Sequence, residues 1–218
     1  MKDQDLISKT AEYIKKKFEN EGTGHDWWHI YRVWQLAKNI ANREKEADIL
    51  AVELAALLHD IADFKFHGGD LTAGPKAASE LLSKFNVPQT VIDDVCHIVE
   101  NVSFKGAGEA NKMKSLEGKI VQDADRLDAI GAIGIARAFA YGGSVSRPMH
   151  NPERKPELHS DFESYSKNTS PTINHFYEKL LLLKDLMNTE TAKRMAQNRH
   201  EFMERYLEEF YDEWDGLL

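Results

Sequence analysis

The stretch LAVELAALLHDIAD, residues 50–63, decides the fold of this chain. Its large apolar residues recur at helical intervals and predict an amphipathic core helix: Leu50, Leu54, Leu57, Leu58 and Ile61. The run ends on His59 and Asp60, two side chains that can bind a metal ion. A carboxylate near a core is costly unless a partner neutralises it, and a bound cation is one such partner. The segment therefore predicts a buried helix that delivers metal ligands at its end.

Apolar spacing indicates helices along nearly the whole chain, and no stretch alternates convincingly as a strand does. We expect helices at roughly 2–20, 26–43, 46–62, 73–85, 88–102, 116–127, 129–141, 171–187 and 189–214. The fold class is therefore all-α. A length of 218 residues is that of one domain, and we expect a single domain over residues 1–218.

The net charge of −8 argues against a protein that follows the phosphate backbone of duplex nucleic acid. A small anionic substrate remains compatible with it, because a bound cation can reverse the potential inside a pocket. The single cysteine, Cys96, forms no internal disulfide and favours a reducing compartment. No apolar stretch has the length of a secretion signal or a membrane span, so we expect a cytoplasmic protein with no membrane partner.

Two further segments carry polar residues on helical faces. In GTGHDWWHIYRVWQLA, residues 22–37, one face carries His25, His29 and Arg32. In IVQDADRLDAIGAIGIARA, residues 120–138, Asp125 and Asp128 project together. The buried side of this second helix is expected to consist of Ile120, Val121, Ala124 and Leu127.

The order of these motifs resembles that of the HD-domain superfamily of metal-dependent phosphohydrolases. The resemblance rests on His29 before Arg32-Val33, on His59-Asp60, and on Asp125 within ADRL, and it covers about residues 20–142. It implies a helical bundle with the C-terminal helices, about 160–218, packed on it. It also implies that one divalent ion is held by His29, His59, Asp60 and Asp125. Metal-activated water would then cleave a phosphomonoester, a phosphodiester or a nucleotide.

The resemblance also suggests roles for neighbouring residues. Arg32 is expected to hold the phosphate, and Asp60 to serve the reaction as well as the metal. Asp63 and Asp128 each follow a predicted ligand by three residues, so each is expected either to orient a ligand or a water, or to make a polar contact at the surface or between helices. Asp26, with His25, would steady His29 or reach the substrate.

His97 lies on the helix where some members place a residue that binds phosphate or a second metal. Relatives often carry a histidine where this chain has Val102, which argues for one metal ion rather than two. We therefore expect His97 to contact substrate, or else to be an ordinary helix residue.

The segment GGSVSRPMHNPERKPELHS, residues 142–160, is a long, proline-rich and locally basic loop. Arg147 and Lys155 make it a candidate for binding a small phosphorylated substrate, such as a nucleotide. The alternatives are that the loop is simply exposed to solvent, or that it forms a contact between two copies of the chain. Similarly, the C-terminal helix either packs on the bundle or pairs with a second chain in a homodimer.

Ligand chemistry limits the metal and the rival functions. Two imidazoles and two carboxylates suit Mn, Fe, Co, Ni or Zn, and Mg less well. One rival is a helical ligand-binding or regulatory module that keeps the metal site but does not turn over substrate. The other is a zinc peptidase built on His25 and His29, which would have Asp26 where HExxH has glutamate and would leave the other ligands unexplained.

Overall fold

Every regular element of the described residues is helical, which confirms the all-α prediction. The computed structural model describes residues 2–19, 26–62, 70, 72–102, 112–158 and 169–218. They fold as two compact units: unit 1 contains residues 2–102 and 112–125, and unit 2 contains residues 126–218. The prediction of a single domain over the whole chain stays a prediction.

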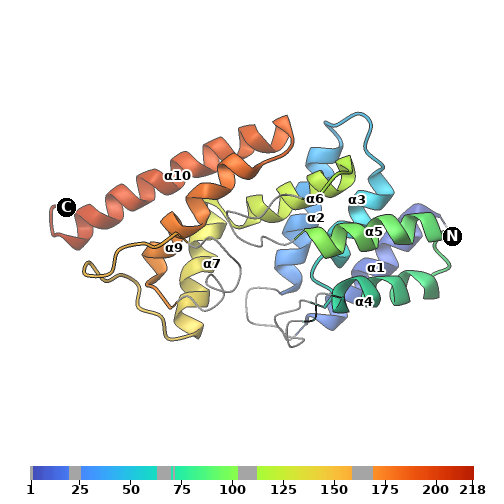
Figure 1. Ribbon diagram of the computed structural model, residues 1–218, viewed down its shortest axis with the longest axis horizontal. Helices are drawn as coiled ribbons and strands as arrows, with labels where there is room; N and C mark the ends of the chain where they lie inside the picture. Colours follow the sequence, from blue (N-terminus) through green and yellow to red (C-terminus); the bar gives the residue numbers. More distant parts are fainter. Residues whose placement is uncertain (1, 20–25, 63–69, 71, 103–111, 159–168) are drawn as a thin grey trace. The chain divides into compact units, whose positions relative to one another are not determined.

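Unit 1 is built around α3 (Ile49–Leu58), which packs against α1 (Asp3–Lys17), α2 (Trp27–Ala41) and α5 (Gln89–Asn101). Figure 1 shows α5 lying beside α4 (Ala73–Lys84). All residues from Ala51 to Leu58 are buried, so α3 is covered on every side. The expectation of a one-sided amphipathic helix was wrong here, because the alanines and valine between the leucines are buried as well.

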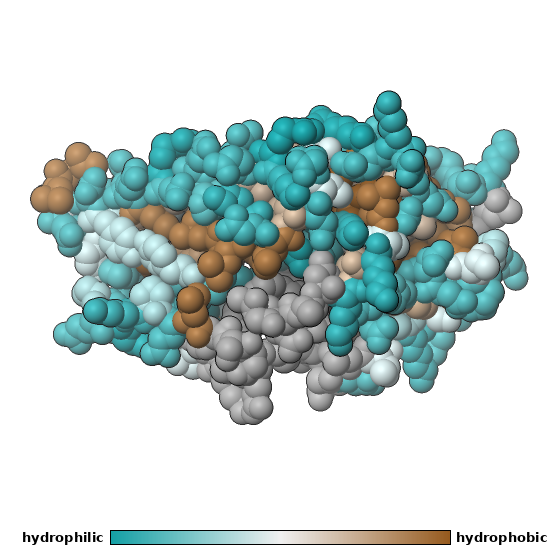
Figure 2. Space-filling view, turned by 45° about the horizontal axis from the view of Figure 1, so that its top comes forward, coloured by the Kyte–Doolittle hydropathy of each residue, from teal (hydrophilic) through white to brown (hydrophobic). Residues whose placement is uncertain are grey.

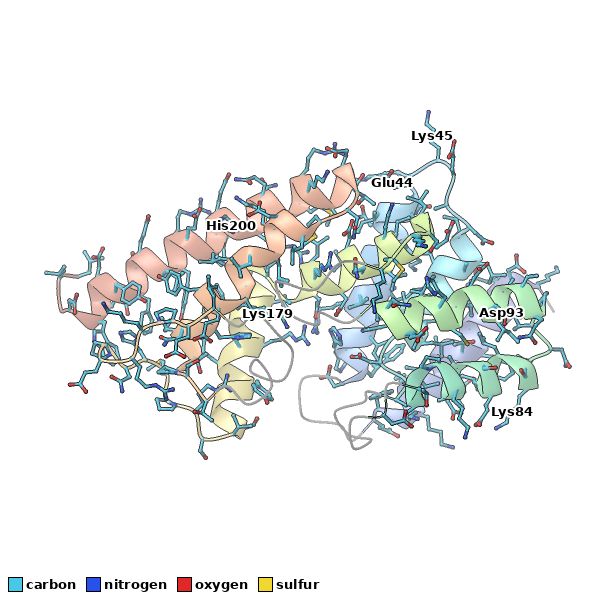
Figure 3. The ribbon with its side chains drawn as sticks, viewed as in Figure 1. Glu44, Lys45, Lys84, Asp93, Lys179 and His200 are labelled. Carbon is cyan, nitrogen blue, oxygen red and sulfur yellow. The ribbon has the colours of Figure 1, made fainter. Side chains whose placement is uncertain are left out.

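The helices α4 and α5 each have one buried face and one exposed, polar face. Lys84 on α4 and Asp93 on α5 are exposed (Figure 3). On α6 (Leu116–Asp128), the expected buried side is confirmed, since its four members are fully buried: Ile120, Val121, Ala124 and Leu127. The first ten residues of this helix belong to unit 1.

Unit 2 contains α7 (Gly131–Ser144), α9 (Thr172–Glu178), the 3₁₀ helix η2 (Leu180–Leu186) and α10 (Glu190–Trp214). The long α10 packs on α7 and η2 (Figure 1). Tyr206 of α10 stacks on Phe176 of α9, with ring centroids 5.9 Å apart. The C-terminal helix therefore packs within unit 2, although its Phe202 is 43% exposed.

The segment predicted as one helix over 171–187 is divided. Lys179 has φ −145° and ψ −58°, which ends α9, and the leucine-rich run after it forms η2. Part of the basic loop is fixed to α9, because the backbone N–H groups of Thr172 and Ile173 donate to Pro148 and Met149 at 2.9 and 3.0 Å. The described part of this loop is thus attached to α9 at these two residues, while most of its side chains are exposed.

Polar side chains cover much of the face of the molecule in Figure 2. Figure 2 shows apolar side chains exposed at the C-terminal tip, where Leu217 and Leu218 are 71% and 75% exposed. Among the described helices, none combines the length and the apolarity that a membrane crossing requires.

Candidate metal centre

His29 lies in the first turn of α2, and its position is set by the residue that begins that helix. Asp26 is the N-cap, and its carboxylate oxygen Oδ1 accepts a hydrogen bond from the backbone N–H of His29 at 2.8 Å. This contact is one of the two roles expected for Asp26. The His29 side chain is only 1% exposed, so its ring nitrogen faces the protein interior.

His59 and Asp60 follow the last residue of α3 and are both buried. Nδ1 of His59 lies 2.8 Å from the backbone oxygen of Ala56. Because a carbonyl oxygen only accepts, Nδ1 donates this hydrogen bond, and Nε2 is the ring nitrogen that faces His29. A backbone carbonyl often orients a metal-binding histidine in this way.

Asp125 approaches from α6, which is tied to the rest of unit 1 by two hydrogen bonds. Oε1 of Glu117 accepts from the backbone N–H of Asp48, the N-cap of α3, at 2.9 Å. Farther along the helix, the side-chain amide of Gln122 donates to the backbone oxygen of Asn101 at 3.3 Å. These contacts connect the helix that carries Asp125 to α3 and α5.

The structure brings donor atoms of the four predicted ligands together. The Nε2 atoms of His29 and His59 are 3.2 Å apart. Oδ2 of Asp60 lies 3.4 and 3.5 Å from these two nitrogens, and Oδ1 of Asp125 lies 3.6 and 3.9 Å from them. An ion with bonds of about 2.1 Å holds neighbouring ligands roughly 3.0 to 3.4 Å apart. Some of the observed separations between donor atoms lie within this range, and the others are slightly longer.

The chemistry of the donors also fits a cation. Nε2 of His59 faces Nε2 of His29, and a carboxylate oxygen of Asp60 lies beside both nitrogens. Nitrogen lone pairs and carboxylate oxygens repel one another unless a proton or a metal ion lies between them. The possible ligand atoms of His29, His59 and Asp125 all lie within 4.8 Å of one another.

Other predicted site residues lie outside this group of donors. Arg32 is partly buried on α2, one turn after His29. His97 is exposed on α5, with Nδ1 3.4 Å from the side-chain nitrogen of Asn101. Asp128 is buried in unit 2, and its Oδ2 pairs with Nη1 of Arg137 at 2.8 Å. The expected roles of Arg32, His97 and Asp128 in the reaction stay predictions.

Arg147 and Lys155 belong to unit 2. The guanidinium of Arg147 lies 5.7 Å from the centre of the Tyr141 ring, and Lys155 is exposed. Their expected role in substrate binding also stays a prediction. Asp63 and His25 lie outside the described residues.

One buried polar residue of α3, the helix that leads to His59, was not predicted from the sequence. Glu53 is buried in α3, and its Oε2 accepts a hydrogen bond from Nε1 of Trp34 on α2 at 2.7 Å. The available signal was a lone glutamate inside the apolar run LAVELAALL. A carboxyl group in such a run is expected to need a buried donor.

Comparison with known proteins agrees with this geometry. The family model of the HD domain matches residues 27–130. The crystal structure of an HD-superfamily hydrolase from Bacillus thuringiensis is 43% identical in sequence, with 98% of each chain covered and a TM-score of 0.76. This chain belongs to the HD-domain superfamily. The resemblance read from its motifs is therefore confirmed.

The protein YpgQ of Bacillus subtilis is 37% identical over 218 residues, which is all of this chain and 98% of YpgQ. A crystal structure of YpgQ in complex with ADP covers 98% of this chain and 97% of that one, at 34% identity and a TM-score of 0.76. A structure from Lactobacillus plantarum is 37% identical, covers 96% of this chain and 97% of its own, and has a TM-score of 0.82. These relatives match the chain over nearly its whole length.

Proposed function

We propose that this protein is a metal-dependent phosphohydrolase whose ion is held by His29, His59, Asp60 and Asp125. The observation that carries the proposal is the convergence of their donor atoms, 3.2 to 3.9 Å apart along five atom pairs, from three separate helical segments. Membership of the HD-domain superfamily supports the same assignment.

A divalent ion held there supplies a Lewis acid for a phosphoryl oxygen and lowers the pKa of a bound water. The side chains of His29, His59 and Asp60 are at most 10% exposed, so they hold their donors away from bulk water. Asp125 is the most exposed of the four, at 29%. We propose that substrate approaches on the Asp125 side, where a phosphate can reach the ion.

Positively charged residues would hold the phosphate. Arg32 lies one turn beyond His29 on the same helix, and its planar guanidinium can donate two hydrogen bonds to a phosphate. We propose that it binds the transferred group, and that Asp63 and Asp128 act in orienting ligands or water. His97, Arg147 and Lys155 are proposed contacts for the remainder of the substrate.

The proposed substrate class is nucleotides. The support is that YpgQ, a relative that matches this chain along its whole length, crystallised with ADP. For the metal, two imidazole nitrogens with two carboxylate oxygens favour Mn, Fe, Co, Ni or Zn over Mg, which prefers an all-oxygen shell.

The test combines metal analysis with a phosphate-release screen. The purified wild-type protein is expected to bind one equivalent of divalent metal and to hydrolyse nucleotides when each candidate metal is supplied in turn. Asp60→Ala is expected to lose both the metal and the turnover, because it removes an oxygen that lies close to both histidine nitrogens. Asp93→Ala is the matched control, since it removes an exposed carboxylate of α5.

Two results would contradict the proposal. If Asp60→Ala retains its metal, Asp60 is not a ligand. If the wild-type protein binds metal and nucleotide without turnover under any metal, the site belongs to a binding or regulatory module. Circular dichroism of both variants checks that the helices are intact.

A further inference from the structure

Glu53 is a polar residue in an otherwise apolar helix. It is the only polar side chain between Ile49 and Leu58, and the residues on both sides of it are buried. Burying a carboxyl group is unfavourable unless it is hydrogen-bonded. Oε2 of Glu53 meets that requirement with Nε1 of Trp34 at 2.7 Å, a short distance for an N–H donor.

This hydrogen bond joins the two helices that carry His29 and His59. Trp34 follows His29 by five residues on α2, and Glu53 precedes His59 by six residues on α3. At 1.5 Å per residue, these intervals are about 8 and 9 Å along the helix axes. The bond therefore lies nearly the same distance from both histidines, on the side of the loop that connects α2 to α3.

Most of the buried residues of α2 and α3 are apolar. Buried residues such as Val33 and Ala37 of α2, and Ala51 and Ala55 of α3, contact their surroundings without directional preference. A hydrogen bond is directional and weakens steeply when its atoms are displaced.

We propose that the Trp34–Glu53 hydrogen bond is a positioning pair that fixes the register of α2 against α3, and thereby the 3.2 Å separation of the His29 and His59 Nε2 atoms. The inference rests on the proposed function, because it takes these two nitrogens as metal ligands. A metal site tolerates changes of only about 0.2 Å in its ligand distances. A slide of α2 along α3 would move one nitrogen out of reach while the apolar core stays packed.

The pair is also held in place on its exposed side. Nζ of Lys38 lies 4.3 Å from the centre of the Trp34 ring, and the Tyr31 ring meets the Trp34 ring edge-on at 6.2 Å. Both neighbours come from α2 itself, so they orient the indole without linking the two helices. Among these contacts of Trp34, the bond to Glu53 is the one that reaches α3.

The test separates metal affinity from stability with Trp34→Phe, Glu53→Leu and the double variant. Each single variant leaves one polar group of the pair without its hydrogen-bond partner, so it is expected to lower the urea midpoint of unfolding. The double variant removes both partners and is expected to recover much of that midpoint. Affinity for Mn(II), measured by titration calorimetry, is expected to stay about 10–100-fold weaker than wild type in all three variants.

Two further variants serve as controls. Tyr31→Phe removes only a hydroxyl group next to the Trp34 ring and is expected to leave Mn(II) affinity unchanged. Glu53→Gln keeps a side-chain oxygen that can accept from Trp34, so its affinity is expected to lie between wild type and Glu53→Leu. This ordering holds as a test even if the double variant fails to fold.

Three outcomes would overturn the inference. The bond is merely structural if the double variant recovers both stability and Mn(II) affinity. The same follows if either single variant binds Mn(II) as tightly as wild type, or if Glu53→Gln binds no better than Glu53→Leu. If the wild-type protein itself binds no Mn(II) or other candidate metal, the proposed function fails as well, so the two failures are distinguishable.

Discussion

His175 on α9 is held in its neutral form by its surroundings. Burial is the largest cause and the positive charges of Lys179 and Arg147 add to it, and together they lower the pKa of His175 from 6.5 to about 3. Lys179 lies at the junction of α9 and η2 (Figure 3). Below pH 6.5 the unfolded chain therefore takes up a proton here that the folded protein does not.

This difference predicts acid sensitivity. The contribution of His175 to the free energy of unfolding is unchanged above pH 6.5 and is lost progressively as the pH falls from 6.5 toward 3. His175→Gln cannot take up that proton, so its urea midpoint is expected to fall less between pH 7 and pH 4.5 than that of wild type. If the urea midpoints of the two proteins fall equally, His175 does not contribute to the acid sensitivity.

At the residue scale, the proposed metal ligands could be predicted because local spacing in the sequence is enough to identify them. His29 and Asp125 lie on helices and His59-Asp60 directly follow α3, each within a short sequence motif, and the structure brings all four together. The Trp34–Glu53 pair could not be found in this way. Its two partners are 19 positions apart on different helices, and only the register between those helices decides which side chains meet.

At the scale of elements, α7 and α9 approach closely at one glycine. A Cβ atom added at Gly142 would lie 2.3 Å from Oγ1 of Thr172, whereas one added at Gly143 would meet nothing within 4 Å. Both glycines lie in the last turn of α7. Substitution of either glycine by alanine changes the helix propensity similarly, so a comparison of the two variants isolates the effect of packing.

This contrast predicts opposite effects of the same substitution. Gly142→Ala is expected to lower the free energy of unfolding by about 1–3 kcal/mol, because the methyl group forces α7 and α9 apart. Gly143→Ala is expected to raise it by up to about 1 kcal/mol, because alanine loses less backbone entropy in a helix. Urea denaturation measures both, and equal effects would mean that the close approach is not tight.

The positions of most helices were predictable, because apolar periodicity reports directly on them. The predicted helix over 88–102, for example, differs from α5 by one residue at each end. Two features were not predictable. The break at Lys179 falls inside a continuous apolar run, and periodicity does not show that η2 replaces an α-helix there. The burial of α3 on all sides depends on which neighbours surround it.

At the scale of the whole molecule, the two units share one helix. The division falls inside α6, after Asp125, so the proposed ligand lies at the last position of unit 1 and Arg126 begins unit 2. Within unit 2 the end of α6 is secured by arginines: Nη1 of Arg126 donates to the backbone oxygen of Leu186, and Nη1 of Arg199 to that of Leu127. The sequence predicted the all-α class but not this division, because apolar patterning does not show which helices pack together.

The most direct test of the account is an anomalous-scattering map of crystals soaked in Mn(II). If the proposed metal site is correct, we expect one strong peak for the ion. It should lie about 2.0–2.3 Å from Nε2 of His29, Nε2 of His59, a carboxylate oxygen of Asp60 and Oδ1 of Asp125. The observed separations of these donors require only small movements to reach such distances. A map with no peak among these atoms, or with its strongest peak at other residues, would contradict the claim that they form a metal centre.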